Sequence, residues 1–184
     1  MVTDVKFEVV EGTEIVTLAK AKKQIRVEAS FVEEDDLIQS YIDAAIGMSE
    51  NYISGHIVEK IMIMKLNSFD NPIVFEAFPI QGIENINYFP LNGTDALLMP
   101  SANYDLISVN PKVSKISFKT VPETQERFDA VTVSVKLGFA DGKTPKPVIQ
   151  AILLQIADMY DRREDRSEIL STAAMSLLRP YKKF

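Results

Sequence analysis

The spacing of apolar residues divides the chain into three stretches. Residues 17–56 repeat their apolar positions every three or four residues, which predicts a short helix followed by a long one. In residues 57–139 the period shortens towards two, and this stretch is predicted to form β-strands. Residues 145–178 return to the helical period. The order is therefore helices, strands and helices.

The two helical stretches are expected to share one core, because each contains a long helix with a single apolar face. The first long helix carries Leu37, Ile38, Tyr41, Ile42, Ala45, Met48, Tyr52 and Ile53 at helical spacing. The second carries Ile149, Ile152, Leu153, Ile156, Met159 and Tyr160. Packing these faces together is the simplest way to bury both.

The predicted fold class is therefore α+β. Residues 17–56 and 145–178 form a helical core, and residues 57–139 form an inserted β-rich lobe of short antiparallel strands. Residues 179–184 follow as a tail. The 184 residues are expected to form a single domain.

Local signals predict how the first helices begin. Thr17 is expected to cap the short helix 18–24, whose lysines Lys20, Lys22 and Lys23 are expected to face solvent. Ser30, with Glu33 three residues later, predicts a capping box at the start of the long helix.

The composition excludes several kinds of chemistry. The chain has no cysteine and one histidine, so thiolate zinc sites, thiol nucleophiles and motifs that need two imidazoles are ruled out. No catalytic residue, cofactor or metal is predicted. The longest uncharged run, 147–157, is too short to span a bilayer, and the first residues lack a secretory signal pattern. We therefore expect a protein made in the cytoplasm, with no membrane partner.

Two features could suggest a reactive site. The acidic run 33–36 offers oxygen ligands for Mg²⁺ or Ca²⁺, but consecutive helical residues point in different directions. The favoured interpretation is that these carboxylates lie in the first turn of the helix, where the positive end of the helix dipole stabilises them. His56 could carry a proton, but no Ser, carboxylate or second His lies at a spacing that nominates a partner. The favoured interpretation is that His56 lies at a helix end and caps carbonyl groups there.

Charge is distributed unevenly along the sequence. The net charge is -6, which argues against a broad surface for binding duplex DNA. Residues 1–92 contain 7 basic and 15 acidic residues, a net charge of -8. Residues 93–184 contain 13 basic and 11 acidic residues, a net charge of +2.

The order of the segments resembles a known family. The N-terminal residues that carry the resemblance are VTLAKAKKQIRV and EEDDLIQSYIDAAIGMSENYISGHIV. The middle ones are FPIQGIENINYF and ANYDLISV, and the C-terminal ones are VTVSVKLGFADGKTPKPVIQAILLQIADMYDRRED. Over most of residues 16–166 the chain is similar to the small head-tail connector (adaptor) proteins of tailed bacteriophages, some of which are labelled DNA-packaging proteins.

The resemblance implies a structural role in virion assembly, without catalysis. Such connectors form a ring of about a dozen copies under the portal protein, extend the DNA channel and dock tail or stopper proteins. The location implied is the head-tail junction of the virion, and the isolated chain could be a monomer. DNA would pass without sequence-specific binding, and an acidic lumen would let it slide because it repels phosphate.

Two charged segments are candidate interfaces with a partner or a neighbouring subunit. The first is the mixed-charge end of the last long helix, with Asp161, Arg162, Asp165 and Arg166. The second is the tail, with Arg179, Tyr181, Lys182, Lys183 and Phe184. The alternatives are a solvated helix end for the first segment and a frayed terminus for the second.

Two other functions remain open from the sequence. One is an interaction domain that forms no ring and binds a protein partner through the β-lobe. The other is a metal-dependent hydrolase or nuclease that uses scattered carboxylates.

Overall fold

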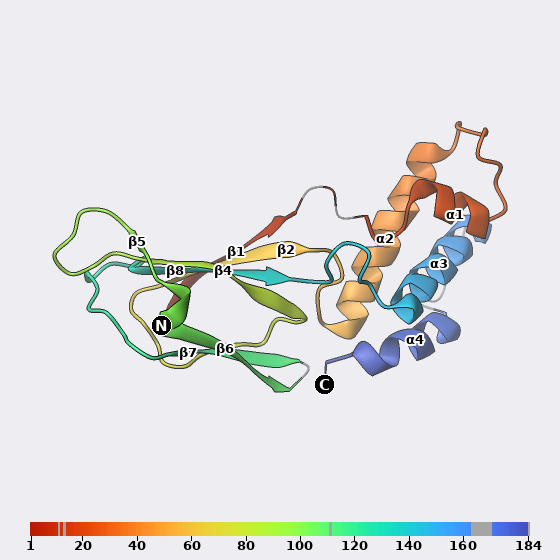
Figure 1. Ribbon diagram of the computed structural model, residues 1–184. Coiled ribbons are helices and arrows are strands. Elements are labelled where there is room, and N and C mark those ends of the chain that lie inside the picture. Colours follow the sequence, from red (N-terminus) through yellow and green to blue (C-terminus); the bar gives the residue numbers. More distant parts are fainter. Residues whose placement is uncertain (11, 13, 111, 163–170, 184) are drawn as a thin grey trace. The chain divides into compact units, whose positions relative to one another are not determined.

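The chain folds into two compact units, each built from two separated pieces of sequence. The computed structural model describes residues 1–10, 12, 14–110, 112–162 and 171–183 (Figure 1). Residues 1–11 and 59–138 form one unit, named here the strand unit. Residues 12–58 and 139–184 form the other, named the helical unit. The strand unit thus includes residues 1–11 in addition to most of the predicted β-rich lobe, and the α+β class is confirmed.

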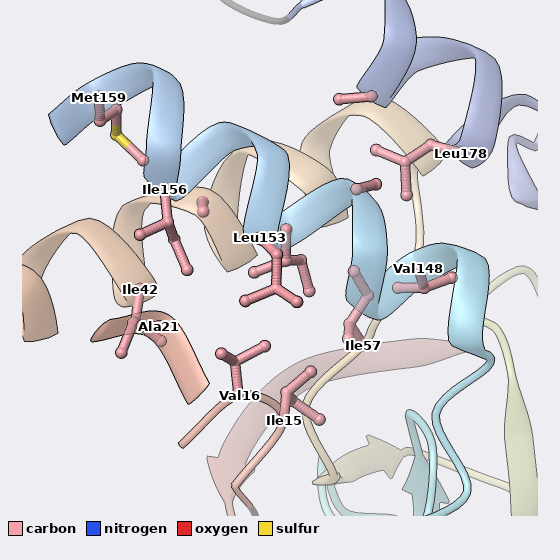
Figure 2. Close-up of a cluster of buried hydrophobic side chains, with 14 of the residues drawn as sticks. Ile15, Val16, Ala21, Ile42, Ile57, Val148, Leu153, Ile156, Met159 and Leu178 are labelled. Atoms are coloured by element: carbon pink, nitrogen blue, oxygen red, sulfur yellow. The ribbon is translucent and has the colours of Figure 1, made fainter. Parts of the chain in front are cut away.

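The helical unit is organised around two long helices that pack along each other. Its described helices are α1 (Leu18–Gln24), α2 (Asp35–Ile53), α3 (Lys146–Asp161), α4 (Thr172–Leu178) and the 3-10 turn η2 (Arg179–Tyr181). α3 contacts α1, α2 and α4. Figure 2 shows Ala21 of α1, Ile42 of α2 and Leu153 and Ile156 of α3 in one buried cluster. The predicted packing of the two apolar faces is confirmed.

Buried polar groups connect α2 and α3 as well. The Gln155 side-chain amide donates to the Ser49 hydroxyl at 2.8 Å, and that hydroxyl donates to the Ala45 carbonyl at 2.8 Å. Towards the other end of the pair, the Tyr160 hydroxyl donates to the Glu34 carboxylate at 2.6 Å. Because buried polar groups need partners, these bonds favour one relative position of the two helices.

Lys22 is buried, so the prediction that all three lysines of α1 face solvent is wrong for this residue. Lys20 and Lys23 are exposed, but only 4% of the Lys22 surface is accessible. The Lys22 ammonium donates to the Phe31 carbonyl at 2.8 Å and forms an ion pair with Asp35. Lys22 therefore holds the backbone of the loop between α1 and α2.

The start of α2 differs from its prediction for a related reason. Thr17 caps α1 as expected, and its hydroxyl accepts from the Lys20 amide at 3.1 Å. The expected capping box at Ser30 and Glu33 is wrong, since α2 begins at Asp35 and has no side-chain cap. The Phe31 carbonyl is bonded to Lys22 and Asp35 is drawn to the same ammonium, so the helix starts at the end of this loop.

The strand unit contains two antiparallel sheets. The five-stranded sheet has the order β1-β2-β8-β4-β5, and the three-stranded sheet has the order β3-β7-β6. The strands are β1 (Val2–Val9), β2 (Lys60–Leu66), β3 (Ile73–Phe75), β4 (Ile80–Tyr88), β5 (Leu97–Leu98), β6 (Tyr104–Asn110), β7 (Val113–Phe118) and β8 (Val131–Leu137), with a 3-10 turn η1 (Ser101–Asn103). The sequence pattern did not indicate a strand at β1 or β5.

One buried cluster joins the two sheets of this unit. β8 lies between β2 and β4, and its alternating valines Val131, Val133 and Val135 are fully buried. The facing sheet contributes Phe75 of β3 and Ile116 of β7 to the same cluster. The clearest alternation in the sequence thus belongs to the central strand, because that strand has a partner on both edges and a covered face.

An ion pair anchors the connection into β8. The Arg127 guanidinium donates to the Asp129 carboxylate, with one bond of 3.0 Å, and lies 3.7 Å from the centre of the Phe89 ring. The hydrogen bond from Arg127 lowers the pKa of Asp129 below its ordinary value of 3.8.

Replacing Lys22 with Ala should destabilise the protein, because the Phe31 carbonyl and the Asp35 carboxylate lose their common donor. We expect a loss of about 1.5–3 kcal/mol in the free energy of unfolding, measured by urea titration. Lys23→Ala, at an exposed position of the same helix, is the matched control and should change stability by less than about 0.5 kcal/mol. Equal stability of the two variants would contradict the assigned role of Lys22.

Asp129→Asn should lower stability only where the carboxylate is charged. A group whose folded pKa is depressed stabilises the fold above its unfolded pKa, and this contribution is lost as the pH falls through the folded pKa. The wild type should therefore be more stable than the variant by at most about 1 kcal/mol near pH 7, and the difference should decline below pH 3.8 and vanish once the pH is below the folded pKa. Thermal unfolding of both proteins across this range tests the expectation. A difference that persists in acid would contradict it.

Candidate assembly surfaces

The predicted interface at the end of α3 is exposed where the structure describes it. Asp161 is the last residue of α3 and Arg162 follows as its C-cap. Arg162 pairs with Asp158 one turn earlier in the helix, at 3.4 Å, and 64% of its side chain remains accessible. The other two predicted residues, Asp165 and Arg166, lie outside the described residues.

The described part of the tail is attached to the helical unit. The Lys183 amide donates to the Ile53 carbonyl at the end of α2, at 2.8 Å. The Lys182 ammonium lies 4.8 Å from the centre of the Tyr52 ring, and half-buried Tyr181 packs on the helical core. Arg179 begins η2 and is exposed, while Phe184 lies outside the described residues. The tail therefore presents its basic groups from a fixed backbone.

The acidic run at the start of α2 separates into two kinds of residue. Glu34 accepts from Tyr160 and Asp35 pairs with Lys22, so both carboxylates stabilise the helical unit. Glu33 and Asp36 are exposed. Just before them, 40% of Phe31 and 66% of Val32 are accessible. Residues 31–36, named here the acidic loop, thus combine two exposed apolar side chains with two exposed carboxylates.

A depression lies between α1 and α3 in the same unit. It has a volume of about 260 Å³ and is lined by Lys20, Lys146, Ile149, Gln150 and Leu153. Small-molecule sites usually enclose roughly 300–1,000 Å³, so this depression suits a side chain rather than a cofactor. Ile149 and Leu153 were predicted to be core residues, and only the contact of α1 with α3 brings both lysines beside them.

The strand unit exposes the edges of both its sheets. β1 is accessible along its whole length, and Val5, Phe7 and Val9 project on one face with 43%, 48% and 62% of their surfaces exposed. β6 forms an edge of the other sheet and exposes Ile107 and Val109. Such edges can accept a further strand from a partner.

The two units share the negative charge. The strand unit contains 8 basic and 12 acidic residues, a net charge of -4. The helical unit contains 12 basic and 14 acidic residues, a net charge of -2. The net charges of the two units therefore differ less than those of the two halves of the sequence, because each unit contains residues from both halves.

The described residues provide neither a metal cluster nor a membrane span. Among them, no three His, Asp or Glu side chains gather in an arrangement that could hold a metal ion. None of the described helices combines the length and hydrophobicity needed to cross a bilayer. His56 lies half-buried in the turn after α2.

Comparison with known families supplies the decisive observation. Residues 15–87 match the family of phage gp6-like head-tail connector proteins. The predicted resemblance is confirmed for these residues. The part of the chain that matches the connector family runs from the start of the helical core, through α1 and α2, into β4. No curated protein sequence matches the chain.

Solved structures share the fold of this chain over nearly its full length. One similar chain comes from the neck of an empty GTA particle computed with C6 symmetry, with a TM-score of 0.75, 16% identity and coverage of 97% of this chain and 96% of that chain. Another comes from the virion of a native gene transfer agent (GTA) particle, with a TM-score of 0.71, 16% identity and coverage of 97% and 95%. A third comes from the neck of a native GTA particle computed with C12 symmetry, with a TM-score of 0.69, 15% identity and coverage of 97% and 96%.

Replacing Tyr181 with Ala should loosen the tail. Tyr181 packs on the helical core, and the bond from the Lys183 amide to Ile53 depends on the tail remaining there. We expect the Lys183 amide to exchange with solvent slowly in the wild type and roughly tenfold or more faster in the variant. Hydrogen exchange followed by NMR measures both rates. Amides in β8, in the strand unit, serve as the internal control, and unchanged exchange at Lys183 would contradict the tail attachment.

Proposed function

We propose that the protein is a structural connector at the head-tail junction of a phage or phage-like particle. In this role it forms a ring under the portal protein, extends the DNA channel and docks tail or stopper proteins. The role needs no catalytic residue and no cofactor. The protein would be made in the host cytoplasm and would then reside in the virion.

The fold of nearly the whole chain carries this proposal. Similarity to neck chains extends over 97% of the residues, so it includes both the helical unit and the strand unit. The match of residues 15–87 to head-tail connectors independently supports the same role. The neck structures were computed with C6 and C12 symmetry, which supports a ring of about a dozen copies of this chain.

The charge distribution supports free passage of DNA through such a ring. A basic lumen would bind DNA in proportion to the phosphates it neutralised, whereas an acidic lumen would repel them. The strand unit has the larger net negative charge, -4, and is the part we propose to line the channel. An assembled ring with a basic lumen would contradict this part of the proposal.

The two charged segments identified from the sequence are proposed to contact partners in the assembly. Asp161 and Arg162 are exposed at the end of α3, in a position to form ion pairs between subunits. Arg179 is exposed beside the attached tail, whose lysines lie near the end of α2. A fixed basic segment loses less entropy on binding than a frayed terminus would.

Mixing the purified protein with its portal protein tests the proposed function. Electron microscopy should reveal an added ring on the portal, and the mass of the complex should give about one copy of this chain per portal subunit. Portal alone and this protein alone are the controls. If the two stable proteins do not bind each other, the proposed function is wrong.

A second candidate, an interaction domain that forms no ring, is favoured by one observation. The exposed edge strands β1 and β6 could each accept a strand from another protein. The mass of the portal complex separates the two functions. A ring requires many copies on one portal, whereas a simple interaction domain would bind without an ordered ring.

A further inference from the structure

We propose that the depression between α1 and α3 receives the acidic loop of a second copy of this chain. The depression is lined by Lys20, Lys146, Ile149, Gln150 and Leu153. The occupant consists of residues 31–36 of the neighbouring copy. The proposal rests on the proposed ring, and it specifies a contact between adjacent subunits.

The depression has the chemistry of an acceptor for an apolar and acidic segment. Half-buried Ile149 provides an apolar surface above the buried Leu153, while Lys20 and Lys146 place two ammonium groups beside it. Lys146 is also the first residue of α3, where the helix dipole adds positive potential. No carboxylate among the described residues lies within ion-pair distance of either ammonium group.

The acidic loop offers the complementary groups. Phe31 and Val32 expose apolar surface, and Glu33 and Asp36 place two carboxylates next to it. One aromatic side chain suits a depression of about 260 Å³. The two exposed carboxylates match the two ammonium groups in number and opposite sign.

Lys22 prepares the loop for binding. Its buried ammonium holds the Phe31 carbonyl at 2.8 Å and pairs with Asp35, so the backbone of the loop is fixed before a partner arrives. A loop fixed in this way avoids part of the entropy loss that accompanies association. Buried Lys22 therefore both stabilises the fold and fixes the acidic loop for binding to a neighbouring copy.

The two surfaces share no residue, so one copy can use both at the same time. Each copy can offer its acidic loop to one neighbour and its depression to the other, which is the heterologous contact that generates rings. The contact is small, with one apolar anchor and two ion pairs. A small contact is consistent with subunits that stay apart in isolation and gather on a portal.

Cysteine cross-linking tests the contact, because the chain has no native cysteine to interfere. V32C and a size-tagged Q150C, mixed at high concentration and mildly oxidised, should give a heterodimer, and the double variant should give a ladder of oligomers. V32C mixed with A173C, at an exposed position of α4, is the matched control. A yield from V32C and Q150C no higher than the control would overturn the proposal.

Charge exchange tests the proposed ion pairs in the same assay. Adding K20E and K146E to the Q150C chain should lower the cross-linking yield about fivefold, and adding E33K and D36K to the V32C chain should do the same. Combining the two altered chains should restore the yield, since the charges are again opposite. Circular dichroism checks that each variant is folded. Loss without restoration would overturn the pairing.

The result can be separated from that of the portal experiment. Portal binding without the V32C–Q150C product overturns this contact and leaves the connector function intact. The product without portal binding supports the contact and contradicts the connector function. If K20E and K146E abolish portal binding but leave the cross-link unchanged, the depression receives the portal protein, and the proposed occupant is wrong.

Discussion

The packing of α2 against α3 is the interaction on which the rest of the structure depends. These helices lie on opposite sides of the strand-rich insert in the sequence, and the bonded pair Ser49 and Gln155 is separated by 106 residues. Their contact closes the helical unit around a single core. It also joins residues 12–58 to residues 139–184, while residues 59–138 form the separate strand unit together with residues 1–11.

This arrangement explains how a chain of modest size can offer several surfaces. The apolar faces of α2 and α3 are buried in the core. Their remaining faces and their ends are available for contacts with other proteins. The contact of α1 with α3 forms the lysine-lined depression, and buried Lys22 shapes the acidic loop. In the strand unit, β8 supports neighbours on both edges while β1 and β6 remain exposed.

The main elements could be predicted from the sequence because burial leaves a periodic pattern. Val131, Val133 and Val135 alternate because one face of β8 is covered, and the stripe of α3 repeats because one face of that helix is covered. β1 was not predicted although Val5, Phe7 and Val9 alternate with polar residues, because strands were assigned only to residues 57–139. Its place in the sheet depends on pairing with β2, which lies far along the chain.

The errors around Lys22 have a different cause. A lysine in the last turn of a short amphipathic helix usually extends into solvent, and Ser30 with Glu33 has the spacing of a capping box. The loop carbonyl and carboxylate that draw Lys22 inward are tertiary partners, so local spacing did not reveal them. The depression was missed for the same reason, since its lysines lie 126 positions apart, at 20 and 146.

The fold determines how the charged residues of the sequence are distributed between the two units. The acidic surplus of residues 1–92 is divided between the two units, because residues 12–58 belong to the helical unit together with the C-terminal segment. What remains is a strand unit with a net charge of -4 and a helical unit with -2. In the proposed ring, the strand unit would line the channel and repel DNA, and the helical unit would present both acidic and basic groups for contacts.

The central claim is that this chain is a structural part of a particle neck. Electron cryomicroscopy of the neck in particles that contain this protein, reconstructed without imposed symmetry, tests it most directly. We expect a ring next to the portal in which every subunit fits both the helical and the strand unit. A complete neck built from other chains, with no density for this one, would contradict the account.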